Sequence, residues 1–510
     1  MLFNSYPFLL LFLPIFLIGF FFLGARYPRW AVAWIGFTSL AFYAWWDYRD
    51  VALLLISIVF NFGVGTRLAE LAHTPSGKRL LTLAVVINLT GLAWFKYADF
   101  SVASVNAMTG AGFDLPGIAL PIGISFFTFT QIAFLVDAWQ GKAREYNFAS
   151  YLAFVTYFPH LVAGPILHHK EMVPQFMDPH ILSPRARNFA ISLTIFVIGL
   201  AKKVLIADNL APYANDLYRA PGEPALLQAW AGTLAYAFQL YFDFSGYSDM
   251  AIGLSRMMGV RLPINFHSPY KSVNIVEFWR RWHMTLSRFL RDYLYIPLGG
   301  NRHGPARRQG NLMLTMLLGG LWHGAGWNFV IWGALHGLYL AINHGWMEFK
   351  QRLQLKTWRG ARPLACLLTF ICVCYAWVFF RATDLPSALN VVRGMSGGFG
   401  MALPQALADR LPWLADLGGA LGVQFYLGGG GRFVETWAWI TGAAVIAFAA
   451  PNSQEIMRRV RPALTGPVFN SPIFSLVWAP RVAWAVALGV VGAIGFLSLS
   501  NPSEFLYFQF

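Results

Sequence analysis

Two histidines carry the strongest chemical signal in this 510-residue chain, because each stands where a titratable side chain is costly. His283 lies in a stretch rich in arginine and aromatic residues, and His323 lies inside an apolar stretch further along. An ionisable group held in an apolar membrane helix is a candidate for function, although a hydrogen-bonded structural histidine is the alternative. Glycines on both sides of His323 leave room for a ligand or another backbone: Gly319, Gly320, Gly324 and Gly326.

A second polar cluster interrupts the apolar segment 227–258. Its motif YFDFSGYSDMAIG contains Asp243, Ser245, Ser248 and Asp249. Two carboxylates in apolar sequence require water, a protein partner or a cavity. The segment is therefore predicted to be broken or re-entrant and to line a polar pocket. An ion-paired structural role, with Arg256 and later arginines as partners, agrees with the sequence equally well.

Segment 278–308 alternates arginines with aromatic residues, which is typical of a helix lying at the membrane interface. Such a helix anchors a chain to membrane lipids, which are one expected partner. The same arginines have the chemistry to bind the phosphates of an anionic acyl donor, such as a coenzyme A ester. The sequence leaves both interpretations open. The candidate donor-binding residues are Trp279, Arg280, Arg281, Trp282, Arg288 and Arg291.

Composition limits the class of protein. The chain is 57% hydrophobic and 12% charged, and its recurring apolar runs predict a polytopic membrane protein. The net charge of +15 fits basic cytoplasmic loops, and no nucleic-acid partner is expected because no soluble basic domain is evident. The 3 cysteines fall in one apolar span, so neither a disulfide framework nor a metal site is expected. GxxxxGK[ST] and GxGxxG motifs are absent, which argues against nucleotide hydrolysis and dinucleotide binding.

The predicted fold is an all-α polytopic integral membrane protein of about 11 to 13 transmembrane or re-entrant helices. The N-terminal apolar run lacks a basic leader and a cleavage site, so we interpret it as the first span. Basic residues after the first, third and fifth spans place the N-terminus outside. Residues 1–390 are expected to form the core, and residues 391–510 a linker followed by two further membrane helices. Spans are expected at residues 8–23, 31–46, 51–65, 80–95, 119–136, 151–166, 188–206, 329–343, 364–380, 436–449 and 482–499.

Six motifs in a fixed order resemble the membrane-bound O-acyltransferases (MBOAT), and within them the bacterial polysaccharide O-acetyltransferases of the alginate type. The motifs are FYAWWD (42–47), LPIGISFFTF (120–129), FPHLVAGPI (158–166), YFDFSGYSDMAIG (241–253), FWRRWHMTLSRFLRDYLYIPLGGNR (278–302) and LTMLLGGLWHGAGWNFVIWGALHG (314–337). The resemblance covers roughly residues 1–390 and is less distinct after about residue 400.

The resemblance implies a tunnel through the membrane and a set of site residues. The intramembrane histidine of the family falls on His323, and its second polar position falls on His283. A neutral imidazole at His323 has the chemistry to take the proton of an attacking hydroxyl, and His283 to orient the donor or bind the oxyanion. A covalent acyl-histidine is not indicated, and no GxSxG motif suggests an acyl-serine. The polar residues expected along the tunnel are Asp243, Ser245, Asp249 and Asn328.

The expected activity is that of an inner-membrane O-acetyltransferase acting on an exported polysaccharide, with alginate as the first expected acceptor. Acetyl-CoA is the implied donor on the cytoplasmic side, and no metal is implied. Periplasmic carrier or acetyltransferase proteins and the polymer itself are the implied partners. Bacterial cellulose is an alternative acceptor, and another superfamily activity on lipid, sterol, protein or teichoic acid is a further alternative. A transporter or a scaffold of a secretion complex is the alternative from a different class.

Overall fold

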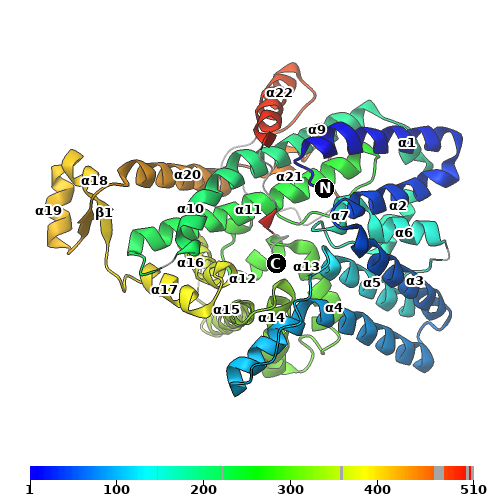
Figure 1. Cartoon of the computed structure of the whole chain (residues 1–510), viewed down its shortest axis with the longest axis horizontal. Helices are drawn as coiled ribbons and strands as arrows, with labels where there is room; N and C mark the ends of the chain where they lie inside the picture. Colours follow the sequence, from blue (N-terminus) through cyan, green and yellow to red (C-terminus); the bar gives the residue numbers. More distant parts are fainter. Residues whose placement is uncertain (146, 221, 356–359, 465–475, 501–504, 507–510) are drawn as a thin grey trace.

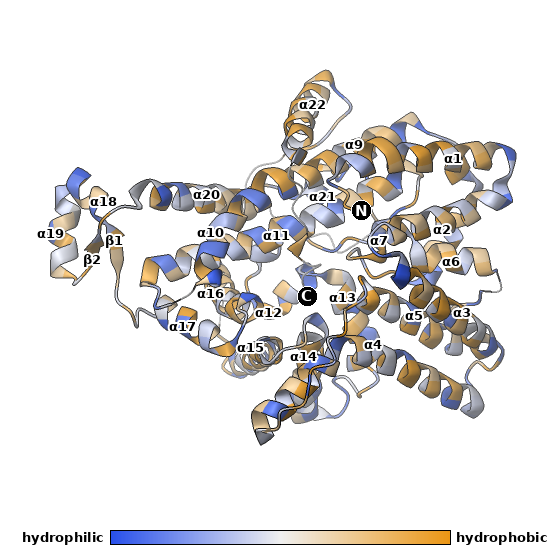
Figure 2. Cartoon of the chain, viewed as in Figure 1, coloured by the Kyte–Doolittle hydropathy of each residue, from blue (hydrophilic) through white to orange (hydrophobic). Residues whose placement is uncertain are grey.

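The computed structural model describes residues 1–145, 147–220, 222–355, 360–464, 476–500 and 505–506 (Figure 1). The described chain is helical apart from one two-stranded sheet, as the sequence predicts. Within it, 6 helical stretches are long and apolar enough to cross a membrane, so the chain is a polytopic membrane protein (Figure 2). These stretches are Pro7–Arg26, Tyr48–Glu70, Pro75–Thr109, Ala186–Arg219, Ala361–Arg381 and Val482–Ser500.

Other expected spans correspond to shorter helices, such as α2 with 17 residues and α5 with 16. The helices of the first half are α1 (Leu13–Arg26), α2 (Pro28–Ala44), α3 (Tyr48–Glu70), α4 (Pro75–Thr109), α5 (Ile124–Trp139), α6 (Phe148–Thr156), α7 (Phe158–Leu161), α8 (His169–Phe176), α9 (Ala186–Ala201), α10 (Asp208–Arg219) and α11 (Leu226–Met257). Short π or 3₁₀ turns extend them: η1 (Pro7–Phe12), η2 (Pro179–Leu182) and η3 (Lys202–Ala207).

The second half contains the helices that carry both candidate histidines. They are α12 (Ile275–Arg281), α13 (Met284–Leu290), α14 (Gly304–His323), α15 (Trp327–Arg352), α16 (Ala361–Arg381), α17 (Leu385–Met395), α18 (Gln405–Arg410), α19 (Pro412–Ala420), α20 (Gly430–Ala449), α21 (Ser453–Ile456) and α22 (Val482–Leu497). The turns η4 (Pro269–Lys271), η5 (Arg291–Tyr295) and η6 (Ser498–Ser500) complete this half.

Side-chain caps explain where several helices begin. Asp47 accepts the backbone N–H of Arg49 at 2.8 Å at the start of α3, and Asn274 accepts that of Glu277 at 2.8 Å at the start of α12. Asp384 caps α17 in the same way through Ser387. The guanidinium and backbone N–H of Arg49 hold the pKa of Asp47 below its ordinary value.

Helix α11 corrects the expectation of a broken or re-entrant segment. It is one continuous helix of 32 residues that packs against α9 and α10 through the middle of the molecule (Figure 1). Its two carboxylates do not break it, because Lys202 and Lys203, the first two residues of η3, neutralise them inside the protein. Long-range partners of this kind satisfy buried charges without any water-filled break.

Segment 278–308 is not a helix lying at the membrane surface, which is a second correction. The chain forms two short helices, α12 and α13, separated by a turn at Trp282–His283 and followed by η5. The aromatic side chains of Phe278, Trp282 and Phe289 are 1%, 3% and 5% exposed, so they lie in the protein core and not in lipid.

Residues after α17 contain more structure than the linker that the sequence predicts. Strands β1 (Ala402–Pro404) and β2 (Gln424–Tyr426) pair in parallel, with Ala402 opposite Gln424, and α18 and α19 connect them. This small unit lies at one end of the molecule, beyond α17 and α20 (Figure 1). Helix α20 returns to the core against α10 and α11, and α22 packs along α9.

Candidate active site

His323 is the last residue of α14 and is 5% exposed. Helix α15 begins at Trp327, so the two helices form a tight hairpin around His323. The hairpin depends on close backbone contact: a Cβ on Gly320 would lie 2.2 Å from the carbonyl oxygen of Phe329. Likewise, a Cβ on Gly333 would lie 2.4 Å from the carbonyl oxygen of Met316. Of the two uses predicted for the glycines near His323, Gly320 serves the approach of another backbone.

A buried lysine holds the end of the helix that carries His323. Lys96, on α4, donates from Nζ to the carbonyl oxygens of Trp322 at 2.5 Å and His323 at 3.3 Å. The hydroxyl of the adjacent Tyr97 donates to the carbonyl oxygen of Leu321 at 2.8 Å. A cation at a helix C-terminus binds carbonyls that have no partner within the helix. Helix α4 thereby fixes the backbone of the last turn of α14.

His283 lies in the break between α12 and α13, with φ of 42°. This left-handed conformation is strained for a residue with a side chain and is typical of functional sites. Asn265 holds the turn, because its Oδ1 accepts from the backbone N–H of Thr285 at 3.2 Å and from the Thr285 hydroxyl at 2.9 Å. The same oxygen lies 3.1 Å from Nδ1 of His283. Since a carbonyl oxygen only accepts, Nδ1 of His283 carries the hydrogen and Nε2 of the neutral ring carries the lone pair.

The two histidines face each other within a compartment of aromatic side chains. Their ring centroids are 6.5 Å apart. Around His323, the ring centroids of Trp322, Trp332 and Phe380 lie at 4.9, 5.0 and 5.2 Å. Each of these aromatic residues is nearly fully buried. Residues from α13, α14, α15 and α16 therefore converge on one desolvated compartment. A hydrogen bond or a developing charge interacts more strongly there than in water.

A cavity of about 750 Å³ opens beside this compartment. Four of the six predicted donor-binding residues line it: Trp279, Arg280, Arg288 and Arg291. The cavity extends to Thr285, which binds the same Asn265 oxygen as His283, and to Met316 on α14. Arg288 is already paired with Glu171 at 2.7 and 3.0 Å, and Arg291 with Asp292. Arg280 is exposed and forms no ion pair with any described residue.

The other two predicted donor-binding residues do not line this cavity. The Arg281 side chain is 3% exposed and lies 2.5 Å from the Glu277 carboxylate. Trp282 is 3% exposed and stacks on Phe278 with ring centroids 5.6 Å apart. Both residues support the turn that presents His283 and are structural in this arrangement. The alternation of arginine and tryptophan does not predict this difference, because the segment places an arginine and a tryptophan in the core and an arginine and a tryptophan at the cavity.

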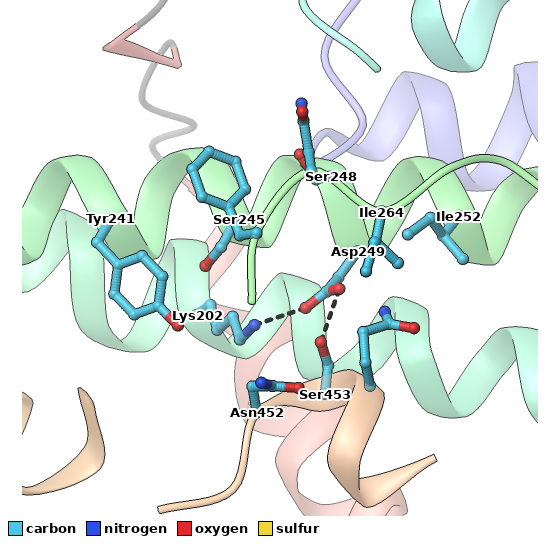
Figure 3. A pocket seen from close by; sticks show the side chains of 12 residues that line it. Lys202, Tyr241, Ser245, Ser248, Asp249, Ile252, Ile264, Asn452 and Ser453 are labelled. Atoms are coloured by element: carbon cyan, nitrogen blue, oxygen red, sulfur yellow. Dashed lines mark hydrogen bonds and ion pairs between the residues drawn. The ribbon is translucent and has the colours of Figure 1, made fainter. Parts of the chain in front are cut away.

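The polar residues predicted on α11 form ion pairs and a small pocket. Lys203 Nζ lies 2.6 Å from Asp243 and 2.9 Å from Asp208. Figure 3 shows Lys202 and Ser453 converging on Asp249, at 2.6 and 2.8 Å. Ser245 lies beside them at a pocket of about 10 Å³, which is room for about one water molecule.

This arrangement corresponds to the ion-paired alternative for α11, but with different cations. The lysines neutralise the carboxylates, whereas Arg256, the expected partner, donates to the backbone oxygen of Gly259. Phe244, next to Asp243, packs edge-on against His283 with ring centroids 4.9 Å apart. Helix α11 therefore reaches the histidine compartment through an aromatic side chain.

Asn328, the fourth predicted polar residue, stands in the first turn of α15. Its Nδ2 donates to the backbone oxygen of Ala382 at 2.9 Å, which ties α15 to the end of α16. The residue is 6% exposed. In the described part of the chain, no group of three or more His, Cys, Asp or Glu side chains is placed to hold a metal ion.

Together these features have the geometry of a site for acyl transfer. Two histidines lie in a desolvated compartment, and an arginine-lined cavity lies beside it, reaching Met284 and Thr285 next to His283. Comparison with known proteins decides the family: the sequence profile of the MBOAT (membrane-bound O-acyltransferase) family matches residues 40–385. The chain belongs to the membrane-bound O-acyltransferase family. It is therefore a multi-pass membrane acyltransferase, and the transporter and scaffold alternatives are not needed.

Three relatives of this chain are named for peptidoglycan, alginate and teichoic acid. The chain is 43% identical to "Peptidoglycan O-acetyltransferase" of Helicobacter pylori, over 100% of this chain and 98% of the relative. It is 46% identical to "Probable alginate O-acetylase AlgI" of Azotobacter vinelandii, over 78% of each chain. Identity to "Teichoic acid D-alanyltransferase" of Streptococcus thermophilus is 28%, over 48% of this chain and 61% of the relative.

Several residues at the site of this acyltransferase were not predicted from the sequence. Lys96 stands in the fourth expected span, and its charge in an apolar segment was a usable signal. His336 is fully buried, and its Nδ1 accepts from Nε1 of Trp279 at 3.3 Å. Asn265 lies in a loop with no local pattern, and Trp332 is one of 20 tryptophans. For these last two, only the fold reveals the position.

Proposed function

We propose that this acyltransferase moves an acetyl group from acetyl-CoA to hydroxyl groups of an exported or envelope polysaccharide, with His323 as the catalytic base. The observation that carries the proposal is the placement of His283 and His323, 6.5 Å apart between ring centroids, next to a cavity lined by arginines. Arginine suits the phosphates of coenzyme A, and the buried imidazoles suit acid–base work on the thioester.

The reaction assigns one step to each group. A neutral His323 takes the proton of the acceptor hydroxyl as its oxygen attacks the acetyl carbonyl carbon. The carbon–sulfur bond then breaks, and the departing thiolate takes the proton back from His323 as coenzyme A leaves. His283 presents the lone pair of Nε2 into the same compartment, since Asn265 holds the hydrogen on Nδ1. In this tautomer Nε2 only accepts, so we assign His283, as a second catalytic residue, to orient the acyl donor by accepting a hydrogen bond from one of its amide N–H groups.

The proposed location is the bacterial inner membrane, with the acetyl group passing outward to the polymer or to periplasmic partner proteins. Charge distribution supports this orientation. Basic residues at the end of α5 (Lys142 and Arg144) and in the loop before α14 mark one end of the molecule as cytoplasmic. Tyr293, beside the cavity, donates to Asp137 at the same end of α5 at 3.0 Å. This placement supports a cavity that opens toward the cytoplasm, where acetyl-CoA is available.

Two acceptors are supported by different relatives. Alginate, the acceptor expected from the motifs, is named in a relative that covers 78% of the chain. Peptidoglycan is named in a relative that covers 100% of the chain, including the region after α17 where the motif resemblance is weak. Full-length coverage favours peptidoglycan as the second candidate acceptor. Cellulose has no support from the relatives described above.

The test uses a strain that lacks its own copy of the gene and carries wild type, His323→Ala or His180→Ala. His180 is the matched control, because its side chain is 73% exposed and, among the described residues, forms an ion pair only with Asp178. Base-released acetate is measured in purified cell-wall sacculi and in secreted polysaccharide, with membrane levels of each variant checked. We expect His323→Ala to remove the acetate from one of the two fractions and His180→Ala to leave it. Unchanged acetate with His323→Ala would overturn the catalytic assignment, and the affected fraction identifies the acceptor.

A further inference from the structure

Helix α15 presents a stripe of buried polar atoms to the centre of the molecule. Asn328, Trp332 and His336 recur every four residues, so they lie on one face of the helix. Asn328 Oδ1, Trp332 Nε1 and His336 Nε2 are all buried, and none has a hydrogen-bond partner within the described residues. Buried polar atoms in folded proteins are nearly always paired, and exceptions need a reason. The reason we consider is a ligand that supplies the missing partner.

Trp332 is the member of the stripe that contacts His323. Its ring lies at 5.0 Å from the His323 ring between centroids, with an interplanar angle of 85°. The residue is 1% exposed and is enclosed by Phe380 and Trp377 at 5.3 and 6.0 Å. An indole Nε1–H is a donor only. This unpaired donor is therefore buried beside His323, in the compartment where the proposed reaction takes place.

Acyl transfer needs such a donor, and several of the other polar groups near His323 already have partners. A neutral His283 presents a lone pair at Nε2, because its Nδ1–H is bound to Asn265, so in this form it does not donate to an oxyanion. Lys96 donates to the backbone oxygens of α14. Asn328 donates to Ala382, and Trp279 donates to His336.

We propose that Trp332 is a catalytic residue whose indole N–H stabilises the oxyanion of the tetrahedral intermediate. When the acceptor oxygen attacks the carbonyl carbon, the π electrons of the C=O bond move to its oxygen, and Trp332 donates its hydrogen bond to that negative charge. As the carbon–sulfur bond breaks, the C=O bond forms again and the hydrogen bond weakens. No proton leaves Trp332 in either step. The inference rests on the proposed acetyl transfer from a thioester.

The first variant is Trp332→Phe, which keeps an aromatic ring and removes the N–H. Loss of one oxyanion donor is expected to lower kcat by about 100-fold to 1,000-fold and to leave KM for acetyl-CoA nearly unchanged. Trp437→Phe on α20 is the matched control, since its Nε1 is also buried without a partner in the described chain but lies outside the compartment. A kcat of Trp332→Phe within a few-fold of wild type would overturn the assignment.

A second variant separates the hydrogen bond from the shape of the side chain. Replacing Trp332 with 3-benzothienylalanine exchanges the N–H for sulfur in a ring system of nearly the same size. The expected kcat loss equals that of Trp332→Phe, with thermal stability in detergent close to wild type. If this variant is as active as wild type, the N–H has no role in catalysis and the proposal is wrong. This variant also decides the question if Trp332→Phe fails to fold.

A binding measurement gives a readout that does not depend on turnover. The probe is a coenzyme A analogue in which a trifluoromethyl ketone replaces the acetyl thioester, because this ketone hydrates to a tetrahedral centre. Trp332→Phe should bind the analogue at least 10-fold more weakly than wild type and bind acetyl-CoA equally well. Equal weakening of both ligands would indicate a structural role and refute the proposal. If wild type shows no acetyl-CoA-dependent acetylation, the proposed function itself fails, whereas a wild-type-like Trp332→Phe beside an inactive His323→Ala refutes only this inference.

Discussion

Neighbouring side chains that are not themselves candidates for catalysis hold His283 and His323 in place. Asn265 Oδ1 accepts hydrogen bonds from Thr285 and from His283, and this fixes which nitrogen of His283 carries its hydrogen. Lys96 binds the carbonyls at the end of α14 and so fixes the backbone of His323. The two histidines are thus held by groups that come from a loop and from α4, both distant in the sequence.

Adjacent arginines at this site are expected to behave in opposite ways. Arg280 faces the cavity without an ion pair among the described residues, so Arg280→Gln should raise KM for acetyl-CoA about tenfold with little change in kcat. Arg281 is buried against Glu277, and Arg281→Gln leaves that carboxylate without its cation, which costs about 3 kcal/mol or more of stability. Steady-state kinetics in detergent and thermal unfolding of the two variants measure these effects.

The comparison of these neighbours distinguishes a donor site from a structural arginine cluster. If Arg280→Gln lowers the melting temperature as much as Arg281→Gln and leaves KM unchanged, the cavity is not the donor site. Because both substitutions replace arginine with glutamine, loss of charge alone would not explain a difference between the two variants.

At the scale of elements, sequence patterns predicted helices well where apolar runs were long and failed where partners were remote. The first, third and fourth expected spans correspond to long apolar helices. Helix α11 was expected to break at Asp243 and Asp249, because the two lysines that neutralise them lie 40 and 47 residues earlier in the chain. Local periodicity contains no information about such pairs. The same limit hid Asn265 and Trp332, whose roles arise only when separate elements pack together.

The α14–α15 hairpin makes a prediction at this scale. A methyl group on Gly333 would lie 2.4 Å from the carbonyl oxygen of Met316, so Gly333→Ala should force the helices apart and cost about 1 to 3 kcal/mol. Gly345→Ala, in the same helix, is the control because a Cβ there meets nothing within 4 Å. We expect Gly333→Ala to lower the melting temperature and the activity together, through displacement of His323. Equal stability of the two variants would show that the hairpin tolerates a wider separation than the structure has.

At the scale of the whole molecule, the proposed reaction path has two ends with different chemistry, the cavity and the region around His323. One end has the arginine-lined cavity, basic loops and the charged end of α5. The other end is the region around His323, where aromatic side chains predominate. The residues that the sequence motifs single out are distributed by the fold among an arginine-lined cavity, the histidine compartment and the ion-paired helix α11. An enzyme that takes a soluble donor on one side and a polymer on the other requires such an asymmetry.

This asymmetry predicts a sidedness that two single cysteines can measure. Arg302, in the basic loop before α14, is exposed and belongs to the cavity end, so Arg302→Cys should react with a membrane-impermeant maleimide only in inside-out vesicles. Arg49, whose side chain is 77% exposed at the start of α3, belongs to the opposite end, so Arg49→Cys should react only in right-side-out vesicles. The native cysteines are all in α16 and serve as the background control. Acetyl-CoA should then support labelling of polymer only when supplied on the side where Arg302→Cys reacts. Reaction of both cysteines from the same side would contradict the orientation, and with it the cytoplasmic entry of the donor.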